Sequence, residues 1–130
     1  CFWPEQGDEV VLGFLNDDPR QAMILGSLYS AKNAVPWPVT EENYEKGIVT
    51  RNNLKLSFVD ENDKESIILQ TPKGNTIILT EETDHGITII DQNKNSMVMN
   101  SQGIKLLSEQ DITIEAKGNI TFKGKQVDVK

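Results

Sequence analysis

The fold follows from residues 104 to 130, which read Ile104-Lys-Leu-Leu-Ser-Glu-Gln-Asp, Ile112-Thr-Ile-Glu-Ala-Lys-Gly-Asn, Ile120-Thr-Phe-Lys-Gly-Lys-Gln and Val127-Asp-Val-Lys. Each unit begins with an apolar residue, and these first residues are eight positions apart except for the last step, which is seven. A second apolar residue follows two positions later, and polar residues suited to turns complete the unit. This pattern predicts a repeat of very short strands.

The predicted core consists of the first and third residues of each unit. These are Ile104, Leu106, Ile112, Ile114, Ile120, Phe122, Val127 and Val129. A strand with two inward positions cannot bury a core alone, so the units must stack. Chance alternation in an ordinary antiparallel sandwich is the alternative for these units taken by themselves.

The same kind of short strand is predicted upstream, with turns rich in Asn, Asp and Gly between the strands. The expected strands are Lys55 to Val59, Ser66 to Gln70, Thr76 to Thr80, Ile87 to Ile90 and Ser96 to Met99. A single-chain solenoid needs roughly 18 or more residues in each rung, which is more than these units supply. We therefore expect each chain to form one wall of an intertwined homotrimer, which leaves no open sheet edge.

The N-terminal part predicts a hairpin, with strands over Glu9 to Leu15 and Gln21 to Tyr29. Gly13 and Gly26 fall inside these strands, as suits a small, strongly coiled barrel. Two strands cannot close a barrel, so the chain is interpreted as a fragment whose missing strands lie upstream. Pro36-Trp37-Pro38 then begins a stiff linker, with room for one helical turn over residues 41 to 46.

The expected organisation has three parts: the C-terminal part of a barrel domain over residues 1–35, a linker over 36–47 and a β-helix over 48–130. Aromatic residues and prolines are concentrated before residue 45. The formal net charge of −7 divides into −5 for residues 1–47, −3 for 48–103 and +1 for 104–130. An acidic chain without a basic stripe is a poor candidate for nucleic-acid binding.

No catalytic, cofactor or metal residue is assigned from the sequence. His85, the lone histidine, lies beside Glu82 and Asp84 in a polar turn, where a solvated surface role is favoured. Cys1 is the only cysteine, so no internal disulfide can form. An axial ion held by one polar side chain from each of three chains stays open, with no residue assigned. No apolar run near 18 residues and no signal-peptide pattern is present.

The stretch Pro4-Glu5-Gln6-Gly7-Asp8-Glu9-Val10-Val11-Leu12-Gly13-Phe14-Leu15-Asn16-Asp17-Asp18-Pro19, with Ile24-Leu25-Gly26-Ser27-Leu28-Tyr29 after it, resembles the oligomer-binding-fold (OB-fold) barrel of VgrG-type spike proteins. These belong to type VI secretion systems and are related to the cell-puncturing needle of contractile phage tails. Lys46-Gly47-Ile48-Val49-Thr50-Arg51 and residues 87–96 resemble the start and body of the family's triple-stranded β-helix. Asp17-Asp18-Pro19 departs from the commoner Asn-Gly-Asp-Pro turn. The eight-residue units lack the Val-x-Gly form of phage needles, which favours a secretion spike over a phage needle.

The resemblance implies an all-β homotrimer with a mechanical, non-enzymatic role in a contractile injection machine. It implies the tail-tube protein Hcp at the base, and a PAAR-repeat tip protein with effectors at the C-terminal end. It also implies assembly in the bacterial cytoplasm and, on firing, delivery through a target membrane. The alternatives are a phage needle, a host- or glycan-binding tail fibre, and a monomeric β-solenoid enzyme acting on polysaccharide.

Overall fold

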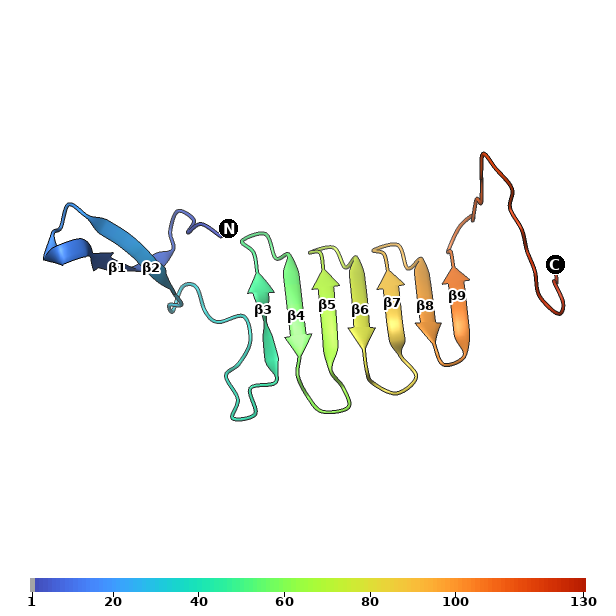
Figure 1. Ribbon diagram of the computed structural model, residues 1–130, viewed down its shortest axis with the longest axis horizontal. Coiled ribbons are helices and arrows are strands. Elements are labelled where there is room, and N and C mark those ends of the chain that lie inside the picture. Colours follow the sequence, from blue (N-terminus) through green and yellow to red (C-terminus); the bar gives the residue numbers. More distant parts are fainter. Residues whose placement is uncertain (1) are drawn as a thin grey trace.

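The computed structural model describes residues 2–130 and is an all-β structure with two antiparallel sheets. A two-stranded sheet lies at one end of the elongated molecule, and a seven-stranded sheet follows it as a single row of short strands (Figure 1). An ion pair between Arg51 and Glu5, 3.1 Å long, connects the first turn of the larger sheet to the N-terminal segment.

The small sheet is the predicted hairpin, formed by β1 (Glu9–Phe14) and β2 (Ala22–Leu28). A one-turn 3-10 helix, η1 (Leu15–Asp17), begins the connection, and Asn16 has a left-handed backbone. Asp18 then accepts hydrogen bonds from the backbone and guanidinium of Arg20, which lower the pKa of the Asp18 carboxyl. The prediction of a hairpin closed by Asn and Asp is confirmed.

The large sheet is a meander in which each strand pairs with the next one along the chain. Its strands are β3 (Glu45–Val49), β4 (Lys55–Val59), β5 (Ser66–Gln70), β6 (Thr76–Thr80), β7 (Gly86–Ile90), β8 (Ser96–Asn100) and β9 (Gly103–Leu107). The first five turns between them contain a residue with positive φ, which is Asn53, Asp63, Gly74, Asp84 or Lys94, and the last turn leads directly into Gly103, whose φ is also positive. Asn, Asp and Gly adopt this conformation most readily, which explains why polar turns separate the strands.

Three expectations need correction. The strands begin at Glu45 rather than Ile48, because Glu45, Lys46 and Gly47 pair with β4. No helical turn forms over 41–46. Residues 108–130 contain no strand and do not pair with the outer edge of β9, the last strand of the large sheet.

The linker folds back on the sheet instead of standing apart from it. Trp37 is half-buried, and its ring lies against the backbone of Gly47 in β3. Even so, none of the described residues is fully buried in the single chain. A sheet of this length without a core is not expected to be stable alone in water.

Candidate functional site: the apolar face of the large sheet

The residue pairs along the ladder place apolar side chains from every strand of the large sheet on one side of it. Side chains alternate between the two faces, so partners at equivalent positions share a face. This apolar face carries Ile48, Leu56, Phe58, Ile67, Leu69, Ile77, Leu79, Ile87, Ile89, Met97, Met99, Ile104 and Leu106. One row of apolar residues therefore runs over all seven strands, from Ile48 to Leu106, and a second runs over six, from Phe58 to Ile104.

The opposite face is mixed in character. Its central row is Gly47, Ser57, Ile68, Ile78, Thr88, Val98 and Lys105. At Gly47 this face is also covered by the linker residue Trp37. The apolar face is therefore more hydrophobic than the mixed face, and it is the face that we expect to be covered in the assembled protein.

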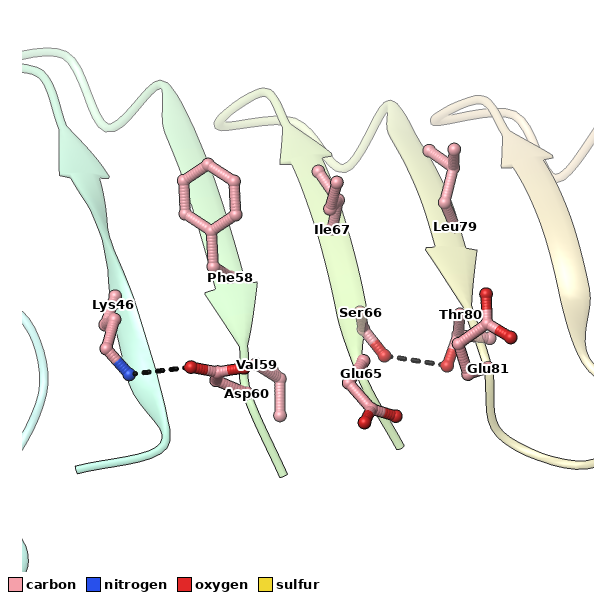
Figure 2. A pocket seen from close by; sticks show the side chains of 10 residues that line it. All are labelled: Lys46, Phe58, Val59, Asp60, Glu65, Ser66, Ile67, Leu79, Thr80 and Glu81. Carbon is pink, nitrogen blue, oxygen red and sulfur yellow. Dashed lines mark hydrogen bonds and ion pairs between the residues drawn. The ribbon is translucent and has the colours of Figure 1, made fainter. Parts of the chain in front are cut away.

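One end of the apolar rows is charged. Lys46 occupies the position that continues the row of Phe58, and its Nζ lies 3.4 Å from the Asp60 carboxylate. Figure 2 shows this pair beside Phe58, with Ile67 and Leu79 following on the next strands. These residues line an open hollow of ≈ 460 Å³. It is a continuation of the uncovered face and not an enclosed site.

The upper edge of the sheet in Figure 1 is held by a ladder of side-chain hydrogen bonds. In the turn 71–75, Asn75 donates to Thr71 Oγ1 at 3.0 Å, and in the turn 91–95, Asn95 donates to Asp91 Oδ2 at 2.7 Å. The Asn95 bond is the main reason that the pKa of the Asp91 carboxyl is lowered.

Each asparagine also reaches the next segment along that edge. The Oδ1 of Asn75 accepts the backbone N–H of Gln92 at 3.0 Å, and the Oδ1 of Asn95 accepts that of Glu109 at the same distance. The ladder stops at the first turn, where Leu54 stands in place of asparagine and Pro72 has no N–H to donate. These turn residues were missed by sequence reasoning, although the recurring Thr/Asp-x-x-x-Asn pattern was available.

The eight residues predicted as trimer core are exposed in the single chain. Ile104 and Leu106 lie on the apolar face at β9, with Ile104 71% exposed. The other six, Ile112, Ile114, Ile120, Phe122, Val127 and Val129, lie in the segment without strands. The structure therefore brings only the first pair together with the rest of the apolar rows.

No cluster suited to catalysis or metal binding forms around the lone histidine. His85 Nδ1 lies 3.7 Å from Glu82 in the exposed turn between β6 and β7, and Asp84 accepts a hydrogen bond from Ser101. Asp91 lies at the opposite edge of the sheet. Among residues 2–130, no group of three or more His, Cys, Asp or Glu is placed to hold a metal ion. Cys1 lies outside the described residues.

None of the described residues forms a helix long and apolar enough to cross a membrane.

Comparison with known proteins gives matches at both the N-terminal end and along the chain. Residues 1–29 match the family of type VI secretion system and phage-baseplate injector OB domains. The chain is 27% identical over 129 residues to the actin cross-linking toxin VgrG1 of Vibrio cholerae, covering 95% of this chain and 10% of that protein. It is 32% identical over 87 residues to the type VI secretion system spike protein VgrG3 of Vibrio cholerae, covering 63% of this chain and 8% of that protein. The chain thus spans about a tenth of the length of these curated relatives.

Proposed function

We propose that this chain, which is a homologue of the VgrG-type spike proteins of type VI secretion systems, forms one wall of a trimeric needle in such a spike. Residues 1–35 are then the end of an OB-fold barrel, residues 36–47 the linker, and residues 48–130 the needle, with its first strand reaching back to Glu45. The needle's role is mechanical and not enzymatic.

The apolar face of the large sheet carries this proposal. Its residues are roughly half-exposed in one chain: Ile67 is 42% exposed and Leu79 41%. Full burial of a side chain of this size is worth about 1.5–3 kcal/mol, so covering two long rows supplies a large driving force for association. Because the mixed face already carries the linker at Gly47, the apolar face is the one that turns inward.

Three copies suit this face better than two. A flat sheet one strand wide is a wall, and three walls related by a three-fold axis along the row of strands enclose a prism with the apolar rows inside. Such a prism has no exposed apolar face. Its walls lose their shape only when many ladder hydrogen bonds break together, which favours kinetic stability in a device that is driven by force.

The segment 108–130 completes the needle in a different way. Its apolar pairs continue the short-strand pattern, yet it has no partner strand within the chain. In a trimer, the same segment from the other two copies provides that partner. We therefore place the intertwined part of the needle here, with Ile112, Ile114, Ile120, Phe122, Val127 and Val129 facing the axis.

We propose the same partners for this chain that the VgrG-type spike family has. The spike would sit on the tail-tube protein Hcp, carry a PAAR-repeat tip protein and effectors beyond its C-terminal end, and cross a target membrane on firing. Assembly in the bacterial cytoplasm would precede secretion.

The test is the absolute mass in solution by light scattering, with an unboiled detergent gel beside it. A mass near three times 14.6 kDa for this chain, and a band that resists detergent, is the expected result. A monomer that stays folded would contradict the proposal, because the apolar face would then need another cover. Turnover in a screen of glycan substrates would instead favour the enzyme alternative.

A further inference from the structure

We propose that the three walls interlock through their turns, with the upper edge of one copy meeting the lower edge of its neighbour through opposite charges. The upper edge consists of the turns 50–54, 71–75 and 91–95, and the lower edge of the turns 60–65, 81–85 and 100–102. This inference rests on the trimer proposed above and specifies which surfaces of the copies meet.

The meander itself sets the geometry. Turns alternate between the two edges, so each turn on one edge is level with a gap between turns on the other (Figure 1). Neighbouring strands are about 4.8 Å apart, so successive turns on one edge repeat about every 9.6 Å. A three-fold rotation moves no copy along the axis, so at each corner of the prism an upper turn faces the gap between two lower turns.

The two edges differ in charge. The lower turns 60–65 and 81–85 carry Asp60, Glu61, Asp63, Glu65, Glu81, Glu82 and Asp84, against one lysine and one histidine. The three upper turns carry one basic residue each, Arg51, Lys73 and Lys94, and a single carboxylate, Asp91. Asp91 is occupied by Asn93 and Asn95 within its own turn.

The basic residues of the upper edge are not equally available. Arg51 pairs with Glu5, whereas Lys73 and Lys94 form no ion pair within residues 2–130. The turn of Lys73 is level with the gap between the lower turns 60–65 and 81–85, so it meets acidic residues on both sides. The turn of Lys94 is level with the gap between 81–85 and the neutral turn 100–102. Lys73 is therefore the stronger contact.

This charge pattern also selects the direction of the chains. If one wall were reversed along the axis with its apolar face still inward, its two edges would exchange places. Acidic edges would then face each other at one corner, and like charges repel. The edge charges thus favour three parallel chains, the arrangement that puts all three C-terminal ends at the same tip.

The first test is zero-length cross-linking of the intact protein with a carbodiimide, which joins lysine to carboxylate. A strand of five residues is about 17 Å long, so a link from Lys73 to the turns 60–65 or 81–85 must join two copies. The link between Lys46 and Asp60, 3.4 Å apart in one chain, serves as the internal positive control. We expect the Lys73 link in the trimer and its loss in Lys73→Arg.

The second test exchanges charges. In the trimer, Lys73→Glu should speed dissociation in urea about 3- to 100-fold at low salt, because three exposed ion pairs are lost per trimer and each shifts an equilibrium about 1.4- to 5-fold. Adding Asp63→Lys and Glu82→Lys should restore the slow rate, and 1 M salt should reduce the difference. Lys105→Glu, on the mixed face, makes the same charge change away from both edges and should have little effect.

The outcomes separate the two proposals. A wild-type monomer would overturn the trimer and the interlocked edges together. A trimer with the Lys46–Asp60 link but no link from Lys73 to the lower edge would overturn the interlocked edges alone, as would equal effects of Lys73→Glu and Lys105→Glu. The inter-copy link together with rescue by the charge exchange would establish the contact.

Discussion

The ring of Trp37 lies so close to Gly47 that a methyl group at residue 47 would lie 2.5 Å from the Cη2 atom of Trp37. The same methyl group would also meet the backbone carbonyl oxygen of Leu56 on the neighbouring strand. Glycine is therefore required at this position by close packing and not by its backbone angle. The contact fixes the linker against the first strand of the large sheet, on the face opposite the apolar rows.

Gly47→Ala should lower the free energy of unfolding by about 1–3 kcal/mol, because the linker or the strand must shift to admit the added carbon. Urea unfolding followed by tryptophan fluorescence measures this change. Gly26→Ala is the matched control, since nothing described lies within 4 Å of the added carbon there. Equal effects of the two substitutions would mean that Trp37 does not pack on Gly47.

Two neighbouring residues on opposite faces of β6 test which face of the large sheet turns toward the trimer axis. Leu79 lies on the apolar face and Ile78 on the mixed face of β6. Leu79→Asp should abolish the trimer, because three carboxylates would be buried at several kcal/mol each. Ile78→Asp should still assemble. Sedimentation of the two variants decides the point, and the reverse pattern would place the mixed face inside.

Ile112→Asp tests the C-terminal segment in the same manner. If Ile112 faces the axis, the substitution places three unpaired charges in the core of the trimer. The detergent-resistant band should then be lost, or the resistant part should be limited to the large sheet. Limited proteolysis should then release residues beyond about 108. A variant that resists both detergent and protease as well as the wild type would show that Ile112 faces solvent.

The ladder at the upper edge predicts unequal effects of two similar substitutions. Asn95 is half-buried and bonds to Asp91, Ser108 and Glu109, so Asn95→Ala should cost about 1–3 kcal/mol. Leu54→Ala, at the equivalent position of the first turn, breaks no such link. Hydrogen exchange should show faster exchange of the Glu109 amide in Asn95→Ala only. Unchanged protection there would exclude the proposed link.

A pH dependence follows from Asp91. Hydrogen bonds lower its pKa below the ordinary value of 3.8 in the folded state, so its carboxylate favours folding at pH values above about 3.8. This contribution is lost as the pH falls below that value through the lowered pKa. Asp91→Asn should therefore reduce the melting temperature at pH 7, and reduce it less at about pH 2. The same reduction at both pH values would contradict this assignment.

The sequence predicted the strands that alternation marks most clearly. The expected ranges at 55–59, 66–70 and 76–80 agree with β4, β5 and β6, because alternating apolar residues and Asn-, Asp- or Gly-containing turns act over a few neighbouring residues. The start of β3 was missed because Glu45, Lys46 and Gly47 read as a polar linker. Pairing with β4 and the cover of Trp37 outweigh that weak local preference.

By itself, the sequence determined an all-β chain of short strands, its hairpin near the N-terminus and the repeated apolar pairs up to Val129, since each depends on local periodicity. Only the tertiary structure decided which residues share a face, that Trp37 covers Gly47, and that Asn75 and Asn95 connect successive turns. These relationships join residues 10 to 20 positions apart, and the register between strands, rather than local preference, brings them together.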